Sequence, residues 1–239
     1  MEINSGNYYR EEGSDMSIEI CLRRFIDSEI LAPGEMGSLK EDVMAVLTRQ
    51  LGKKPLWKEG SSLNEKSLPL GGPEILIQLQ RYAAHIDLMN RPPETPATGE
   101  RLIEDKWLLR YWEQLDNELT SKELSFKHVI WTGSIGIFFI PVDFPEPLLI
   151  EENELDGEEG AIETIEYISI GSSYQLLKEL DTLNQWLKLQ GDYGDLGEIV
   201  SVDVFENDAD PWHEIKWAWL VLRWMARQSI EKKLTICCE

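Results

Sequence analysis

The sequence lacks the cysteine pattern that would brace a small domain or bind a structural metal. Its three cysteines, Cys21, Cys237 and Cys238, are odd in number, and two of them are adjacent. This arrangement neither frames a disulfide scaffold nor supplies the four ligands of a zinc site. We therefore expect reduced thiols that pack as small apolar side chains, and no cofactor.

Long apolar runs are also missing. No stretch approaches the roughly 18 consecutive apolar residues that a membrane-spanning helix requires. The opening residues, MEINSGNYYREEGSDM, have neither the basic start nor the apolar centre of a secretory signal. We therefore expect a cytoplasmic protein that does not associate with membranes.

Lysine and arginine are absent from two long stretches. Residues 128–177 contain ten acids and no base, and residues 189–215 contain eight acids and no base. These stretches hold 18 of the 21 excess negative charges, whereas the rest of the chain, with 26 acids and 23 bases, is nearly balanced. Such a chain repels nucleic acid and anionic lipid, because binding either normally requires bases that neutralise phosphates. Its field would instead attract a basic protein or a cation.

The composition that remains is that of a folded protein. Apolar residues make up 42% of the chain, charged residues 28%, and there are nine tryptophans, far more than a disordered polar chain would carry. A length of 239 residues suits one large domain. We expect a flexible segment over residues 1–15 and a single globular domain over residues 16–239, with an acidic connector at 150–163.

The hydrophobic pattern predicts both helices and strands. Helical periodicity with capping residues favours helices at 38–52, 73–91, 101–119, 172–191 and 210–233. Runs rich in β-branched and aromatic residues favour strands at 16–25, 128–140, 164–170, 199–205 and 234–238, while 53–70 resembles a loop. Helices and strands do not alternate strictly, so we predict an α+β or mixed α/β fold. About five helices would surround a small, partly antiparallel sheet.

The last predicted helix differs from the others because it is apolar on nearly all sides between Ile215 and Ala226. Such a helix must be enclosed by other elements, so we expect it at the centre of the fold. Its tryptophans point in several directions and should act as packing anchors. Arg223 and Arg227 on the same helix need carboxylate partners, and an internal salt bridge is favoured over a substrate clamp.

The stretch IEENELDGEEG, residues 150–160, places six carboxylates in eleven residues. Three interpretations stay open: a calcium loop, a solvated connector, and a surface for a basic partner. With Glu152 as the first ligand position, Gly157 and Glu163 fall at the turn and bidentate positions of an EF-hand. Glutamate replaces the aspartate expected at the first position, and prolines precede the stretch where a helix should enter. Specific calcium binding is therefore the least favoured interpretation.

Motifs for catalysis are few. TGSIG and IGSS contain serines beside glycines, but neither forms a nucleophile elbow, and no lysine completes a phosphate loop. His85, His128 and His213 occupy different predicted elements. Only His213, beside Asp210 and Glu214, could act as a general base or metal ligand. We expect no catalytic, cofactor-binding or metal-binding residue.

We therefore predict a non-enzymatic acidic protein-binding module, most concretely an immunity-type or adaptor inhibitor that docks a basic toxin or nucleic-acid-binding protein. The expected contact set comprises Glu151, Glu152, Glu154, Asp156, Glu158 and Glu159, with Asp203, Glu206, Asp208 and Asp210 as a second lobe. Two alternatives stay open. One is a small metal-dependent hydrolase that uses carboxylates near His213, and the other is a globular protein whose charge serves only solubility.

Overall fold

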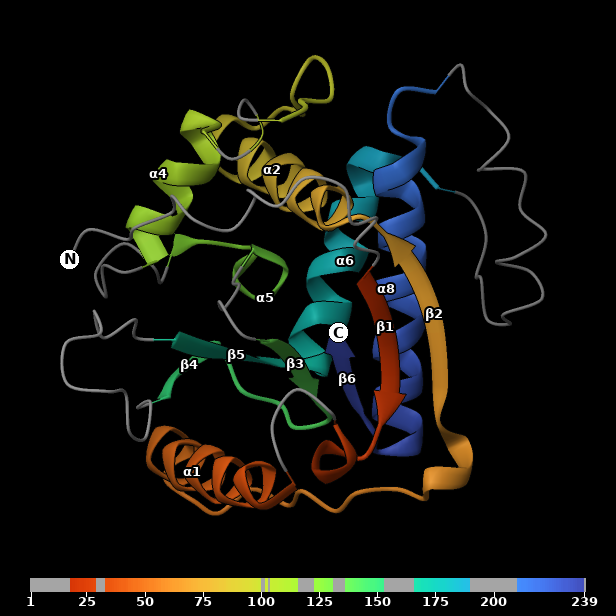
Figure 1. Cartoon of the computed structure of the whole chain (residues 1–239). Helices are drawn as coiled ribbons and strands as arrows, with labels where there is room; N and C mark the ends of the chain where they lie inside the picture. The colour runs from red at the N-terminus through yellow and green to blue at the C-terminus, as the bar shows by residue number, and fades with distance from the viewer. Residues whose placement is uncertain are drawn as a thin grey trace, which may run out of the picture.

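The protein is described here from a computed structural model, which places residues 18–28, 33–99, 102, 104–115, 123–130, 136–152, 166–189 and 210–238. Within these residues, six α-helices and two short 3-10 helices accompany one six-stranded mixed sheet, which confirms the predicted single α+β domain (Figure 1). The strands are β1 (Ile18–Arg23), β2 (Lys66–Gly71), β3 (Gly136–Ile140), β4 (Leu148–Glu152), β5 (Glu166–Ser172) and β6 (Thr235–Cys238). The helices are α1 (Pro33–Leu51), α2 (Pro73–Met89), α4 (Lys106–Leu115), α5 (Lys127–Ile130), α6 (Ser173–Leu187) and α8 (His213–Lys232), with η1 (Phe25–Asp27) and η2 (Ser62–Asn64).

The strand order in the sheet is β2-β1-β6-β3-β5-β4. Strand β6 lies between β1 and β3 and pairs antiparallel with both. Strands β3 and β5 run parallel, while β4 pairs antiparallel with β5. The segment 234–238, predicted only as a short closing strand, is thus a central strand that joins two halves of the sheet.

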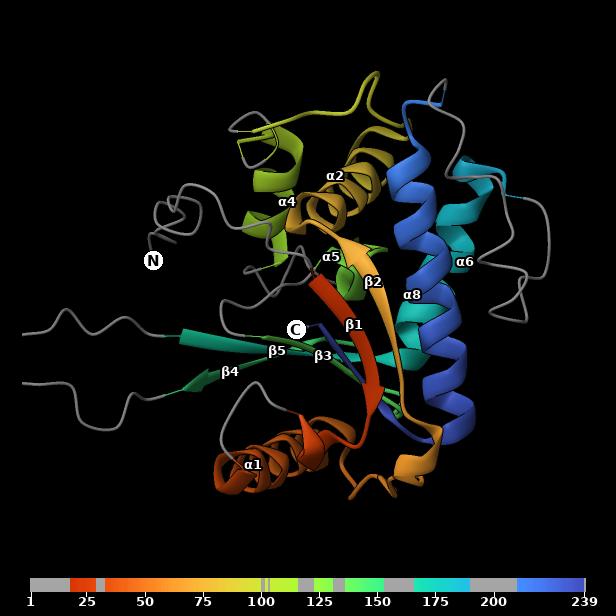
Figure 2. The ribbon, with the colours of Figure 1, turned by 45° about the vertical axis from the view of Figure 1, so that its right-hand side comes forward.

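Two hydrophobic clusters cover opposite faces of the sheet. Helix α1 packs on one face, where Phe25, Met36 and Phe138 are fully buried. Helices α2, α6 and α8 lie on the other face, where Trp219 is buried among the side chains of the larger cluster. The views in Figures 1 and 2 show α1 on the opposite side of the strands from these three helices. Side chains along a strand point alternately to the two faces of a sheet. Phe138 and its neighbour Phe139 therefore belong to different clusters.

Helix α8 is the central helix that the sequence predicts. Its residues are almost all buried from Ala218 to Ala226. The indole nitrogen of Trp219 donates a hydrogen bond to the Leu180 carbonyl oxygen at 2.7 Å, which ties α8 to α6. Arg223 Nε lies 2.6 Å from Asp181 Oδ1, so the internal salt bridge expected for this arginine is confirmed.

Several local expectations need correction. Residues 53–70, expected as a loop, contain β2, which tolerates Pro69 because it is an edge strand. Residues 127–130 form the short helix α5 rather than the start of a strand. Helix α1 begins at Pro33, five residues before the predicted Ser38 cap, and α8 begins at His213 rather than beside Asp210. The weak strand expected at 199–205 lies outside the described residues.

No helix in the described part of the chain combines the length and the apolar character that crossing a bilayer would demand.

Candidate partner-binding surface

The ten carboxylates expected to contact a partner fall into two groups. Glu151 and Glu152 are the last residues of β4, so the strand takes in the start of the predicted connector, and Asp210 lies just before α8. The other seven lie outside the described residues: Glu154, Asp156, Glu158, Glu159, Asp203, Glu206 and Asp208.

The two acidic stretches are attached to different sides of the domain. Glu152 and Glu166 are paired across β4 and β5, so the chain leaves and re-enters the sheet at one place. The second stretch connects the end of α6 to the start of α8. Figures 1 and 2 both place the free ends of β4 and β5 away from the start of α8. The structure therefore does not bring Glu151 and Glu152 together with Asp210.

Asp210 has a structural role that the sequence only partly indicates. Its carboxylate lies 2.5 Å from Lys216 Nζ and accepts a hydrogen bond from the Trp212 backbone nitrogen at 3.0 Å. Partial burial raises the pKa of Asp210, but the bonds from Lys216 and Trp212 outweigh it and hold the pKa below its ordinary value. Asp210 thus stabilises the turn that leads into α8, and its charge is already matched by a lysine.

His213 lies in the first turn of α8, as expected. Its Nδ1 atom is 2.9 Å from the carbonyl oxygen of Asp210, not from its carboxylate. The neighbouring Glu214 is exposed. Among the residues that the structure places, no three His, Cys, Asp or Glu side chains are grouped so that they could hold a metal ion. The described contacts of His213 are therefore those of a helix start.

Charge is distributed unevenly between the described domain and the rest of the chain. The described residues contain 24 acids and 20 bases, a net charge of −4, whereas the other residues contain 20 acids and 3 bases, a net charge of −17. Many charges of the domain are matched internally, by the pairs Arg24–Asp27, Lys40–Glu59, Arg81–Asp105, Lys127–Glu146, Lys216–Asp210 and Arg223–Asp181. The domain is thus close to electrical balance.

A buried polar junction between α5 and α6 was not visible in the sequence pattern. The Glu179 carboxylate accepts hydrogen bonds from the backbone nitrogens of His128 and Val129, both at 2.9 Å. Burial raises the pKa of Glu179 to about 8. Sequence periodicity does not reveal contacts between residues some fifty positions apart. The only signal in the sequence is that Glu179 lies among apolar residues of α6, which suggests a buried carboxylate.

His128 belongs to the same junction. Its Nδ1 accepts a hydrogen bond from the Ser172 backbone nitrogen at 3.0 Å, and its Nε2 lies 3.2 Å from the Pro145 carbonyl oxygen. This pair of contacts fits a neutral ring that carries its proton on Nε2. Burial lowers the pKa of His128 to about 4. Both ring nitrogens are engaged, so His128 serves the packing of β5 rather than proton transfer.

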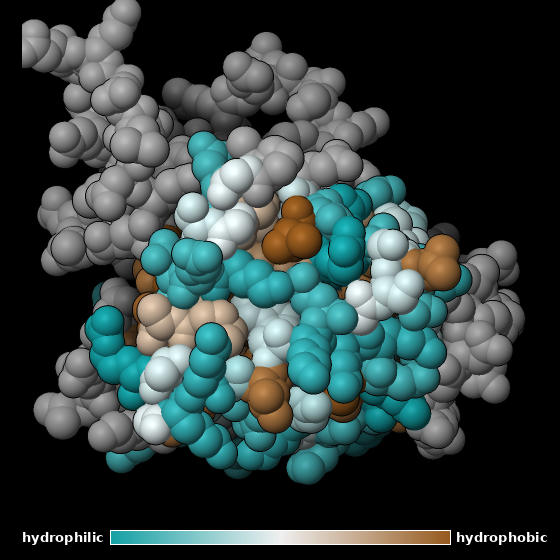
Figure 3. All heavy atoms as spheres, turned by 90° about the horizontal axis from the view of Figure 1, so that it is seen from below, coloured by the Kyte–Doolittle hydropathy of each residue, from teal (hydrophilic) through white to brown (hydrophobic). Residues whose placement is uncertain are grey.

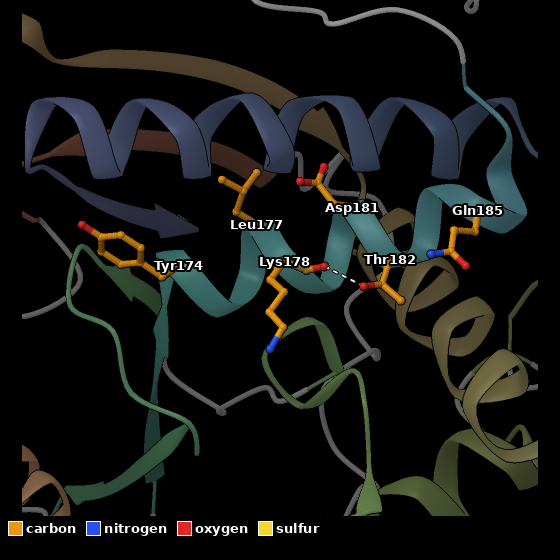
Figure 4. A pocket seen from close by; sticks show the side chains of 6 residues that line it. All are labelled: Tyr174, Leu177, Lys178, Asp181, Thr182 and Gln185. Atoms are coloured by element: carbon orange, nitrogen blue, oxygen red, sulfur yellow. Dashed lines mark hydrogen bonds between the residues drawn. The ribbon is translucent and has the colours of Figure 1, made fainter.

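The two best-formed hollows among the described residues do not gather the expected carboxylates. The first, of about 420 Å³, follows one face of α6 and is shown in Figure 4. There Asp181 turns toward α8, and Thr182 donates a hydrogen bond to the Lys178 carbonyl oxygen. The second, of about 260 Å³, lies between α2 and α4, where Asp105 binds Arg81 at 2.7 Å and His85 at 3.1 Å.

Comparison with known proteins identifies the family. The family model described as "Putative DNA-mimic protein" matches residues 16–238. Searches of curated proteins and of solved structures find no match. Since the family match covers nearly the whole chain, this protein belongs to the family described as putative DNA-mimic proteins.

Proposed function

We propose that this chain is an acidic protein-binding module that occupies the DNA-binding surface of a basic partner. Membership in a family described as DNA mimics supports a partner of the DNA-binding class. Proteins of that class bind DNA largely through lysine and arginine contacts to phosphates. Carboxylates that no base of their own chain neutralises compete for the same lysines and arginines.

The separation of charge is the observation that carries this proposal. Residues 128–177 and 189–215 hold 18 of the 21 excess negative charges, and the rest of the chain, with 26 acids and 23 bases, is nearly balanced. Charge that served only solubility would not need to be separated in this way, since interspersed surface charge is sufficient. Grouped negative charge instead raises the rate at which a basic partner associates.

Residues of both acidic stretches form the proposed contact set. The first lobe contains Glu151, Glu152, Glu154, Asp156, Glu158 and Glu159, and the second contains Asp203, Glu206 and Asp208. Asp210 can contribute only by releasing Lys216, so we assign it a smaller part. Because the lobes are attached to different sides of the domain, we expect a partner to engage one of them first.

An immunity-type or adaptor inhibitor is a narrower form of the same proposal. A basic nuclease toxin presents the same phosphate-binding groups as other DNA-binding proteins, and an acidic inhibitor would block its substrate site. Inhibition of cleavage by purified basic nucleases, measured beside simple displacement of DNA, separates this narrower form from a general DNA mimic.

Displacement of DNA tests the proposal directly. Fluorescent duplex DNA is bound to each member of a panel of purified basic DNA-binding proteins, and the chain is added while anisotropy is recorded. We expect release of DNA from at least one member, with an effect that weakens as salt is raised. A variant with all six carboxylates from Glu151 to Glu159 changed to glutamine or asparagine should lose this effect.

The control changes the same amount of charge elsewhere. Six exposed acids of the described domain are replaced by their amides: Glu41, Asp42, Glu65, Glu104, Glu113 and Glu123. Both variants have a net charge of −15, because each loses six of the 44 acids. Equal loss of displacement in both would show that total charge matters rather than position. Absence of displacement by the unaltered chain across the panel would refute the proposal.

A further inference from the structure

Positive charge gathers at one end of this acidic protein. Contacts join three segments there: the end of β1, the part of the loop that leads from Gly60 into β2, and the C-terminal end of α8. The Gly60 backbone nitrogen donates to the Lys233 carbonyl oxygen at 2.8 Å, and Leu22 on β1 pairs with Lys66 on β2. Figures 1 and 2 both show these segments together below the sheet. We call this region the basic end and define it by Lys58, Lys66 and Lys233, with Lys53 and Lys54 at the start of the same loop.

The five lysines of the basic end are exposed, and none has an ion-pair partner among the described residues. Nearby acids are mostly engaged. Asp27 pairs with Arg24, Glu59 with Lys40, and Glu231 with Lys232, which leaves the exposed Glu65 as the nearby acid without a described partner. The basic end therefore carries a local excess of positive charge.

Two leucines of the loop 53–65 are almost fully exposed. Leu56 is 90% exposed and Leu63 is 94% exposed, the most exposed large apolar side chains of the described domain. Their backbones are held in place. Trp57, next to Leu56, is buried against Phe25 with the ring centroids 5.1 Å apart. Ser61 Oγ accepts a hydrogen bond from the Leu63 backbone nitrogen at 3.3 Å. Figure 3 shows this face as largely hydrophilic, with separate apolar side chains among the polar ones.

The described residue that adjoins the second acidic stretch, Asp210, lies far from the basic end. Helix α8 has 20 residues and so spans about 30 Å from the second acidic stretch to the basic end. At physiological ionic strength, charges separated by more than about 8 Å are largely screened. An anionic surface that approaches the basic end therefore meets mainly its lysines.

We propose that the basic end docks on anionic phospholipid membranes. The lysines would contact lipid head groups, and Leu56 and Leu63 would enter the boundary of the acyl chains. Leucines that protrude among lysines suit a soft anionic lipid surface. A second copy of this chain would need a hollow to receive them, and the hollows described above are lined by residues of other segments. The expectation that the chain avoids membranes followed from its total charge, and the proposal departs from it for this end alone.

Co-sedimentation with lipid vesicles tests the docking. The full chain is mixed with vesicles of phosphatidylcholine alone or of phosphatidylcholine with phosphatidylglycerol. We expect binding to the anionic vesicles only, weakened by salt. The double variant Leu56→Ser with Leu63→Ser should reduce vesicle partitioning by about tenfold or more, since each leucine loses its transfer from water. Changing Lys58 and Lys66 to glutamine should also weaken binding.

Matched controls keep the result specific. Leu109→Ser with Leu149→Ser alters two less exposed leucines far from the basic end, and Lys178→Gln with Lys188→Gln removes exposed lysines of α6. Both controls should sediment with the vesicles as the unaltered chain does. Circular dichroism verifies that each variant is folded. The proposal is overturned if the unaltered chain ignores anionic vesicles at low salt, if the controls lose binding equally, or if the basic end prefers duplex DNA or polyglutamate.

Discussion

The two ends of helix α8 have opposite electrostatic character. Before its first residue, His213, lies a stretch of 24 residues, 189–212, with seven acids and no base. At its other end, Lys232 and Lys233 join the loop lysines of the basic end. This arrangement also suits the helix macrodipole, which favours acids at the N-terminus and bases at the C-terminus. The net charge of −21 for the whole chain therefore does not reveal the local charge at either end of α8.

The comparison shows how one protein can present two surfaces to different partners. The centre of α8 is buried and packs against α6, so it holds the ends apart at a fixed distance. Under the proposals above, a basic protein would be attracted to the acidic stretches and repelled from the basic end.

The largest effect is expected from removal of the packing at the centre of α8. Trp219 is 1% exposed and binds the Leu180 carbonyl oxygen, so Trp219→Ala leaves both a cavity and an unpaired carbonyl. We expect the free energy of unfolding in urea to fall by about 3–5 kcal/mol. Leu63→Ala, at an exposed position, should change it by less than about 0.5 kcal/mol. A loss below about 1 kcal/mol for Trp219→Ala would contradict the central position of this helix.

The second effect concerns the buried junction between the ends. Burial raises the pKa of Glu179 to about 8, so the folded protein keeps a proton that the unfolded chain loses above pH about 4.3. Stability due to this group therefore falls as the pH rises toward 8. Burial lowers the pKa of His128 to about 4, so its contribution rises between pH about 4 and 6.5. The two trends oppose each other below pH about 6.5.

We therefore expect the free energy of unfolding to decline by about 2 kcal/mol between pH 6.5 and 8, where Glu179 titrates without compensation by His128. Glu179→Gln should flatten this decline while its amide oxygen still accepts the backbone hydrogen bonds of α5. Urea titrations at several pH values measure the decline in unfolding free energy. Glu123→Gln, which alters an exposed acid, is the control. An unchanged decline in Glu179→Gln would mean that another group titrates in this range.

A smaller effect is expected at the acidic end of α8. Asp210→Ala removes the acceptor for the Trp212 backbone nitrogen and the partner of Lys216, which should cost about 1 kcal/mol of stability in thermal or urea unfolding. Asp210→Asn keeps an acceptor and should cost less. Because the pKa of Asp210 is held below its ordinary value, the difference between the native chain and Asp210→Asn should disappear as the pH falls below about 4. Equal losses for both variants would point to the ion pair alone.

The smallest effect is expected at the basic end. Lys233 ends α8 with a positive φ of 57°, a conformation that glycine adopts without steric cost. Lys233→Gly should therefore raise the free energy of unfolding by about 0.5 kcal/mol. Lys233→Ala removes the same charge but keeps the Cβ atom, and it should not stabilise the protein. Differential scanning calorimetry can resolve the two variants.

Much of the fold could be predicted because the responsible signals are local. The apolar run of α8, the Pro73 at the start of α2 and the Ser172 cap of α6 all lie within a few residues of the structure that they specify. Strand β2 was missed because Pro69 argues against a central strand and the sequence does not reveal that β2 is at an edge. Helix α5 was missed because its N-terminal amides bind Glu179, a partner about fifty residues away.

The candidate site was predictable only in part. Charge along the chain is read directly from the sequence, so the two acidic stretches and the attraction to a basic partner could be expected. The attachment of the two stretches to different sides of the domain could not be predicted, because it depends on the strand order. The basic end escaped notice because its lysines come from segments far apart in sequence, Lys53 to Lys66 and Lys233, which meet only after β1, β2 and β6 have paired.

The central position of β6 also sets the order in which the protein can be assembled during synthesis. Strands β1 and β2 can pair early, and β3, β5 and β4 can form a second ribbon, but residues 235–238 are translated last of the six strands. Until they emerge from the ribosome, β1 and β3 each have an open edge that could pair with another chain. The N-terminal strand must therefore wait for a partner more than 200 residues away, so the sheet should close slowly, in a single late step.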